Sequence, residues 1–249
     1  MLGLQNRQEA IKKYKENFKK DLLEDVIPFW DRHSRDQEFG GYFTCLTADG
    51  KVYDTDKFVW LQARQVWTYA KIYNEISPKK DWLDTALLGA DFLEKNGRDQ
   101  EDSWYFSLNR EGKPLVQPYN IFSDCFATMA FGQLSTATKE DRHAEIAYKS
   151  FQNIIRKSGN PKGSYNKIYP GTRDLENFAL PMIMCNLVME IEHLLEPHLV
   201  KEHLDRGIYT VLDKFYKPEY GLILENIGLD GQMNDSFPGR LINPGHGLE

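Results

Sequence analysis

Apolar and polar positions along the chain predict two kinds of helix that alternate. Helices of the first kind carry apolar residues on one side only, and they are expected over residues 7–27, 81–96, 139–157 and 197–216. Helices of the second kind are apolar on nearly every side, and they are expected over 58–73, 121–134 and 175–191, with His246 opening a fourth. Because a helix that is apolar all round has to be buried, the second kind should form an inner layer that the first kind covers.

A strand-like or irregular insert precedes each inner helix, at residues 36–57, 104–114, 159–173 and 221–231. Three inserts contain an acidic residue followed by glycine, which is a turn signal: Asp49-Gly50, Glu111-Gly112 and Asp230-Gly231. Outer helix, insert and inner helix thus form a unit that repeats about every 55 to 70 residues. An open solenoid of helix pairs is the alternative, but TPR and HEAT repeats are shorter and lack such inserts.

The repeat predicts an all-α fold with one domain over residues 1–249. We expect an incomplete (α/α)6 barrel, a toroid with about four of six helix pairs and short β-hairpin inserts on one rim. The last predicted inner helix has only begun when the sequence stops at Glu249, so we expect the domain to be truncated at its C-terminal end.

Composition narrows the function classes. The net charge is −6 without a basic block, which argues against nucleic acids and anionic membrane surfaces as partners. No run approaches the length of a membrane span, and the charged N-terminus has no apolar signal region. The three cysteines are scattered and lack a CxxC motif, which favours a reducing compartment, so we expect a cytoplasmic protein. No His or Cys spacing is typical of a metal site, and we expect no metal.

Candidate chemistry lies where the inner helices begin, because starts of one repeat type should gather on one rim of the barrel. Arg64 stands early in its helix between Trp60 and Trp67, where burial and the helix dipole both disfavour a cation. It would suit a sugar oxygen or a developing oxyanion. The alternative is an ion pair with Glu176, and the tryptophans could belong to the core as well as to a sugar platform.

The other candidates are Glu176, Asn177, His246 and Glu249. Glu176 and Asn177 could bind substrate or cap their helix. His246 has a side chain suited to proton transfer near neutral pH, and Glu249 stands three residues on, close enough to orient the imidazole. The remaining histidines are expected at the surface: His33, His143, His193, His198 and His203.

Three segments resemble the N-acylglucosamine 2-epimerase family, also called renin-binding protein: Phe58–Val66 (FVWLQARQV), Glu176–Asn186 (ENFALPMIMCN) and Gly239–Glu249 (GRLINPGHGLE). The resemblance implies an (α/α)6 barrel, in agreement with the repeat. It also implies an isomerase that inverts a sugar at C2, by removing and returning the proton beside the carbonyl of the open-chain form. The expected reaction interconverts N-acyl-D-glucosamine and N-acyl-D-mannosamine.

The resemblance assigns roles by position. The Arg matching Arg64 contacts substrate near O1 and O2, the His matching His246 is one of two catalytic histidines, and the Glu matching Glu249 lies beside it. Asn177 matches a substrate-contacting Asn of related disaccharide epimerases. Those relatives place a His where this chain has Pro181, which favours the N-acylhexosamine branch. The second catalytic His lies in the last helix pairs of the family, so we expect this chain alone to be inactive and to expose apolar surface at its open edge.

Three other functions stay open at this point: an aldose–ketose isomerase of the mannose/fructose type, a sugar-binding regulatory protein without catalysis, and a glycoside hydrolase using two opposed carboxylates. The His-centred rim suits proton transfer better than the last of these. The epimerase chemistry needs no cofactor. Family members often respond to ATP as an allosteric effector and commonly form homodimers, although the sequence shows no phosphate-binding loop.

Overall fold

The computed structural model describes residues 2–118, 121–160, 171–172 and 174–242. The helices are α1 (Leu2–Asp21), α2 (Ile27–His33), α3 (Val59–Glu75), α4 (Lys80–Asn96), α5 (Phe122–Thr138), α6 (Asp141–Lys157), α7 (Ala179–Glu190) and α8 (Pro197–Tyr209). The short strands are β1 (Cys45–Leu46), β2 (Val52–Asp54), β3 (Lys57–Phe58), β4 (Ser107–Leu108), β5 (Pro114–Val116), β6 (Leu175–Asn177), β7 (Tyr216–Lys217), β8 (Leu222–Ile223) and β9 (Asn226–Gly228). π-helical turns at Leu22–Val26 and Thr210–Phe215 and 3₁₀ turns at Glu192–Leu194 and Pro238–Arg240 complete these elements.

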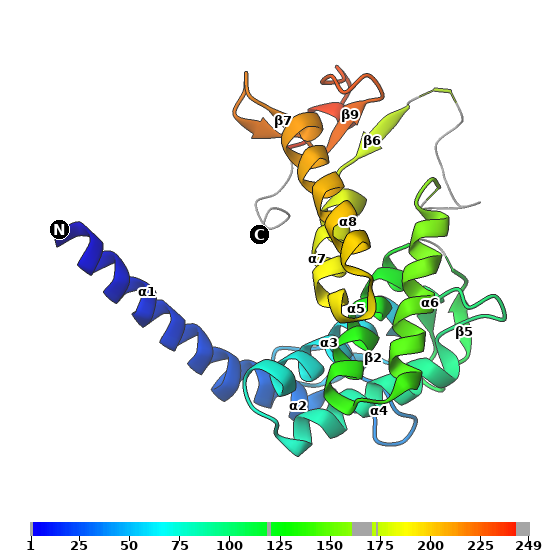
Figure 1. The fold of residues 1–249 in the computed structure, drawn as a ribbon. Coiled ribbons are helices and arrows are strands. Elements are labelled where there is room, and N and C mark those ends of the chain that lie inside the picture. The colour runs from blue at the N-terminus through cyan, green and yellow to red at the C-terminus, as the bar shows by residue number, and fades with distance from the viewer. Residues whose placement is uncertain (1, 119–120, 161–170, 173, 243–249) are drawn as a thin grey trace.

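The predicted alternation of inner and outer helices is confirmed. Helices α3, α5 and α7 form the inner layer, and α4, α6 and α8 lie outside them (Figure 1). Small residues such as Ala63, Ala127 and Ala130 are fully buried, which lets the inner helices approach closely. Glu190, the last residue of α7, ties the three inner helices together, since its carboxylate accepts hydrogen bonds from Trp67 on α3 (2.9 Å) and Gln133 on α5 (2.7 Å).

The first helix differs from its prediction. It begins at Leu2 and continues through the π-helical turn into α2, ending at His33 instead of near residue 27. Pro28 does not end it, because this proline stands in the first turn of α2, where a missing backbone N–H costs little. Helix α1 projects away from the other helices (Figure 1), so its apolar residues Ile11 and Phe18 are 65% and 69% exposed.

Two predicted hairpins are confirmed. β1 pairs with β2, and β4 pairs with β5, each antiparallel. Gly50 and Gly112 turn these hairpins with φ values of +83° and +94°, a left-handed conformation that glycine adopts without strain. β3 adds a third strand that was not predicted, pairing with β4 directly before α3 begins. The third insert, at 159–173, lies largely outside the described residues.

The start of the third inner helix was wrongly predicted. Residues Leu175–Asn177 form strand β6, and α7 begins only at Ala179. The reason is a long-range pairing that periodicity does not reveal, because β6 pairs antiparallel with β9 of the fourth insert. Phe178 then closes the junction by packing edge-on against Phe215, with ring centroids 5.2 Å apart.

One histidine was also wrongly predicted. His143 is buried rather than at the surface, since it lies on the inward side of α6 against Phe131. Its Nδ1 is 2.8 Å from Thr138 Oγ1, and burial lowers its pKa. Within residues 2–118, 121–160, 171–172 and 174–242, no helix combines the length and apolar character that a membrane crossing needs.

Candidate active site

A buried ion-pair network fixes the point where α3 begins. The ammonium group of Lys57, on β3, lies 2.9 Å from Asp36 Oδ2 and also donates to the carbonyls of Gly40 (2.6 Å) and Arg110 (2.8 Å). Arg110 donates to both oxygens of Asp36. Burial acts to raise the pKa of Asp36, but the hydrogen bonds from Arg110 and Lys57 outweigh it and lower the pKa to about 2. Asp36 is therefore ionised and anchors β3 to two neighbouring loops.

Two glutamines fix the rotation of α3 about its axis. Gln62 Oε1 accepts from the backbone N–H of Tyr42 (2.7 Å), while its Nε2 donates to the carbonyl of the same residue (2.8 Å). Gln65 Nε2 donates to Ser34 Oγ (2.6 Å). These three bonds tie one side of α3 to the loop that precedes β1. The helix therefore presents Trp60 and Arg64, one turn apart, on a different side.

Trp60 and Arg64 meet Phe126 of α5. The ring centroids of Trp60 and Phe126 are 6.1 Å apart, and the guanidinium carbon of Arg64 lies 5.1 Å from the centre of the Phe126 ring. This distance permits a cation–π contact. Arg64 is exposed, and no carboxylate of the residues that the structure describes forms an ion pair with it. The alternative of an Arg64–Glu176 ion pair is wrong, because Glu176 pairs with Lys214 at 2.9 Å.

Glu176 and Asn177 lie together on β6. Asn177 Oδ1 accepts from the backbone N–H of Ala179 (2.9 Å), the first residue of α7, although Phe178 and not Asn177 is the N-cap of that helix. Its Nδ2 donates to Asn226 Oδ1 on β9 (2.9 Å). Figure 1 places β6 and β9 beyond one end of α7 and α8, on the far side from α2.

The structure thus groups the predicted site residues into two sets. Trp60 and Arg64 form one set with α5, and Glu176 and Asn177 form the other with β9. The predicted residues His246 and Glu249 lie outside the described residues. The described histidines stand elsewhere: His193, for example, lies 3.0 Å from Ser135 Oγ, toward the opposite end of α5 from Phe126.

Sequence reasoning missed Phe126 as a member of the first set. A signal was present, since Phe126 stands in the second turn of an inner helix, as Arg64 does in α3. Side chains at the same height of two parallel neighbouring helices can touch. It also missed that Gln62 and Gln65 act on the backbone and the preceding loop. Among the described residues no group of three or more His, Cys, Asp or Glu is placed to hold a metal ion.

This arrangement can bind a polar, neutral or anionic molecule. An exposed guanidinium beside two aromatic rings offers charged hydrogen-bond donors next to apolar faces, a combination that suits the oxygens and the C–H faces of a sugar. The described residues place no carboxylate or imidazole in contact with Arg64, so any proton transfer has to come from groups beyond this set.

Comparison with known proteins agrees with the sequence resemblance. The sequence model of the N-acylglucosamine 2-epimerase family matches residues 41–249. The chain is 35% identical over 253 residues to N-acylglucosamine 2-epimerase of Mus musculus, covering 99% of this chain and 60% of that protein. The cellobiose 2-epimerase of Bacteroides fragilis is 28% identical over 250 residues, covering 94% of this chain and 63% of that protein.

Solved structures confirm the fold. A sugar epimerase from a ruminal bacterium superposes with a TM-score of 0.75 at 20% identity, over 87% of this chain and 59% of that chain. A D-mannose isomerase superposes with a TM-score of 0.72 at 15% identity, over 88% of this chain and 56% of that chain. The predicted α/α toroid is thereby confirmed, and the chain spans about 60% of the length of the mouse relative. With the family match extending over most of its length, this chain belongs to the N-acylglucosamine 2-epimerase family.

Proposed function

We propose that the complete protein interconverts N-acyl-D-glucosamine and N-acyl-D-mannosamine. The observation that carries this proposal is the 35% identity to the mouse N-acylglucosamine 2-epimerase, which extends over 99% of this chain. Pro181 supports the same substrate class, since it stands where the sequence of disaccharide epimerases is expected to carry a His.

Arg64 has the first role in the proposed reaction. Its guanidinium donates hydrogen bonds to O1 of the open-chain sugar, and Trp60 and Phe126 contact the apolar face of the sugar. A base removes the proton from C2, and the electrons of the broken C–H bond move toward O1 to give an enolate. Return of a proton to the opposite face of C2 completes the inversion. Arg64 lowers the barrier because the negative charge develops next to a cation that needs no reorientation.

His246 is the proposed base, with Glu249 orienting its ring. An imidazole near its ordinary pKa can take up and give back a proton at neutral pH. By the family resemblance, a second His, in the last helix pairs of the family, protonates the other face of C2. Glu176 and Asn177 are retained as candidate substrate contacts, although Glu176 already pairs with Lys214 and Asn177 already accepts a hydrogen bond from the backbone N–H of Ala179.

The test is incubation of the complete protein with N-acetylglucosamine in deuterated water, followed by NMR. N-acetylmannosamine carrying deuterium at C2 is the expected product. A ketose formed from mannose would favour the isomerase instead, and sugar binding without deuterium uptake would favour a non-catalytic protein. Assays with and without ATP test it as an effector in the same experiment.

Arg64→Gln is the matched variant. It should lower kcat/KM by about 10² to 10³, the usual loss when one donor to a developing oxyanion is removed. Arg206→Gln is the control, because Arg206 is an exposed residue of α8 that pairs only with its helix neighbour Glu202 at 2.6 Å among the described residues. Equal activity of Arg64→Gln and the unaltered protein would refute the role of Arg64.

A further inference from the structure

We propose that Gln62 is a positioning residue for the reaction, because it holds α3 at the rotation that aims Arg64 at the sugar. The inference rests on the proposed function, since it concerns the same site, but Gln62 is fully buried and acts only through Arg64. The fixed point against which Gln62 works is the backbone of Tyr42. In this role the side-chain amide decides where the guanidinium stands, in addition to stabilising the fold.

The amide of Gln62 is bound at both of its ends. Its Oε1 accepts from the backbone N–H of Tyr42 (2.7 Å), and its Nε2 donates to the carbonyl of the same residue (2.8 Å). Two residues of an antiparallel β-ladder exchange hydrogen bonds in the same pattern. A flipped amide would set donor against donor and acceptor against acceptor, so only one orientation satisfies Tyr42. The amide therefore cannot turn without leaving buried polar groups unpaired.

Tyr42 is held independently of α3. Its hydroxyl donates to the backbone carbonyl of Thr85 on α4 (2.6 Å), and its side chain is fully buried. Its ring fills the space beside Gly89 of α4, where an added Cβ would lie 2.3 Å from the ring. The residue before it, Gly41, has a φ of +71°, and an added Cβ there would lie 2.8 Å from Gln62 Oε1. Glycine therefore suits this position, and the Tyr42 backbone forms a rigid reference that joins α3 to α4.

Other contacts near Arg64 restrain the rotation of α3 less. The Phe126 ring lies 5.1 Å from the guanidinium carbon, but a cation–π contact tolerates a range of positions. Gln65 donates a single bond to a serine of the preceding loop (2.6 Å) and is only half-buried. Trp67 donates one bond to α7 (2.9 Å) and is also half-buried. Of these restraints, Gln62 is the one that is both fully buried and bonded twice.

Helix geometry links the two side chains. Residues two apart on an α-helix point about 200° apart around the axis, so Gln62 and Arg64 lie on opposite sides of α3 and move together when the helix turns. A rotation of about 10° displaces a group about 6 Å from the axis by about 1 Å. A displacement of about 1 Å at a reacting centre can lower a rate about 100-fold, so a small release of α3 is enough to disable Arg64.

Gln62→Met tests this role in the complete protein, since Met has a similar volume and forms neither bond. Rates with N-acetylglucosamine are measured well below the unfolding temperature and expressed per folded molecule. The expected result is a kcat lowered about tenfold or more with KM changed by less than about threefold, because Arg64 acts on the charge that develops in the enolate. An unchanged kcat of the folded protein would overturn the proposal.

A second comparison adds Gln62→Met to Arg64→Gln. Because Gln62 acts through Arg64, the added change should lower kcat by no more than about twofold. A residue that only stabilises the fold has no such dependence on Arg64. Losses that multiply in full in the double variant would therefore refute the positioning role.

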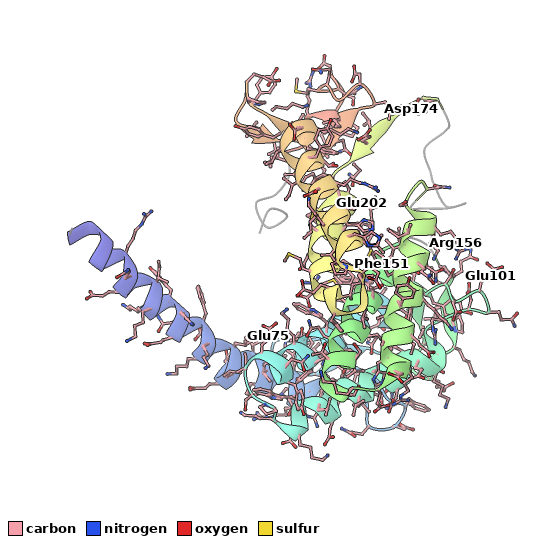
Figure 2. The ribbon with its side chains drawn as sticks, in the orientation of Figure 1. Glu75, Glu101, Phe151, Arg156, Asp174 and Glu202 are labelled. Atoms are coloured by element: carbon pink, nitrogen blue, oxygen red, sulfur yellow. The ribbon has the colours of Figure 1, made fainter. Side chains whose placement is uncertain are left out.

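Asn153→Leu is the matched control. Asn153 is also a buried amide bound at both ends, since it donates to the carbonyl of Asp102 (2.8 Å) and accepts from Arg156 (2.8 Å). It lies on the outer helix α6, on which Figure 2 labels Arg156. This variant should lower the unfolding temperature and leave the kcat of the folded protein unchanged. An equal loss of kcat in Asn153→Leu and Gln62→Met would count against the proposal.

Gln62→Glu provides the test if Gln62→Met does not fold. A protonated carboxyl group both donates and accepts as the amide does, whereas a carboxylate only accepts. Since burial favours the protonated form, the kcat of this variant relative to the unaltered protein should rise as the pH is lowered from about 8 to about 5. A ratio that does not depend on pH would overturn the assignment.

Crystal structures of the variants give a readout without turnover. The distance of 5.1 Å between the guanidinium carbon of Arg64 and the centre of the Phe126 ring is the quantity to compare. It should change by about 1 Å in Gln62→Met and stay the same in Asn153→Leu. Absence of N-acetylmannosamine from reactions of the unaltered protein would refute the proposed function alone, while an unmoved guanidinium in Gln62→Met would refute the positioning role alone.

Discussion

Replacing Lys57 by Met should destabilise the fold strongly, although Lys57 has no part in the proposed reaction. The Lys57 side chain is fully buried, and so is that of its partner Asp36. Its ammonium group serves three acceptors, namely Asp36 Oδ2 and the carbonyls of Gly40 and Arg110. Met fills a similar volume but donates no hydrogen bond, so the change isolates the loss of the charge and its bonds.

The magnitude follows from the buried carboxylate that remains. The pKa of Asp36 falls from 3.8 to about 2 in the folded protein, so its ionisation contributes about 2 kcal/mol at neutral pH. Breaking a buried pair from one side usually costs about 3 to 5 kcal/mol, because the other charge stays buried. Arg110 still contacts Asp36, which places the expected loss at about 3 kcal/mol. For a domain of this size that corresponds to a fall in Tm of about 10 °C.

Thermal unfolding followed by circular dichroism measures the effect. The control is Asp36→Leu/Lys57→Met, which removes both charges and should recover at least half of the loss, because no uncompensated carboxylate remains. The lowered pKa of Asp36 also sets a sign for pH. Its contribution is present above pH 4 and is lost as pH falls toward 2, so the unaltered protein should lose this increment in acid and the double variant should not. A loss below 1 kcal/mol for Lys57→Met, or a double variant no more stable than the single one, would refute the reasoning.

Three further predictions concern the packing of the helix layers. Gly89→Ala should lower the free energy of unfolding, measured by urea titration, by about 3 kcal/mol, because an added Cβ on α4 would collide with the buried ring of Tyr42. Gly159→Ala is the control and should leave this free energy unchanged, because the space around Gly159 is open. Burial raises the pKa of Asp124 to about 6, so its contribution to stability is present below pH 4 and is lost as pH rises through 6. The free energy of unfolding of the unaltered protein should therefore fall by about 3 kcal/mol between pH 4 and 7, and that of Asp124→Asn should not, when unfolding is measured at each pH. Glu190→Ala should lower the stability measured by thermal unfolding by about 3 kcal/mol, because it removes the hydrogen-bond acceptor that the inner helices share. A loss of only about 0.3 kcal/mol would contradict this.

Much of the fold could be predicted because it rests on local signals. Helix α5 is apolar on nearly all sides because it is buried on nearly all sides, and α6 is apolar on one side because only that side is buried. The hairpin turns at Gly50 and Gly112 were equally readable, since both glycines adopt positive φ. Each of these features depends on residues that are close in sequence.

The errors arise where distant segments meet. Residues Leu175–Asn177 have a helical pattern, but β9, about fifty residues on, supplies backbone partners that hold them as a strand. Pattern alone also placed His143 at the surface, whereas the inward side of α6 accepts it because Thr138 supplies a hydrogen-bond partner. Similarly, the cation–π contact between Arg64 and Phe126 joins two helices whose relative height no periodicity specifies.

The predicted convergence of four chain segments on one rim can now be divided into two physical links. The first link joins α3 and α5 through Trp60, Arg64 and Phe126. The second link joins the end of β6 to residue Leu241, which precedes the predicted His246 element, through Glu225. The backbone N–H of Phe178 donates to the carbonyl of Glu225 (3.0 Å), and the backbone N–H of Glu225 donates to the carbonyl of Leu241 (2.8 Å). The insert 221–231 thus holds the start of α7 and residue 241 together through backbone hydrogen bonds alone. Because each link is stabilised by its own hydrogen bonds or ring contacts, loss of one need not dissolve the other, and substitutions at Arg64 should leave the pairing of β6 with β9 intact.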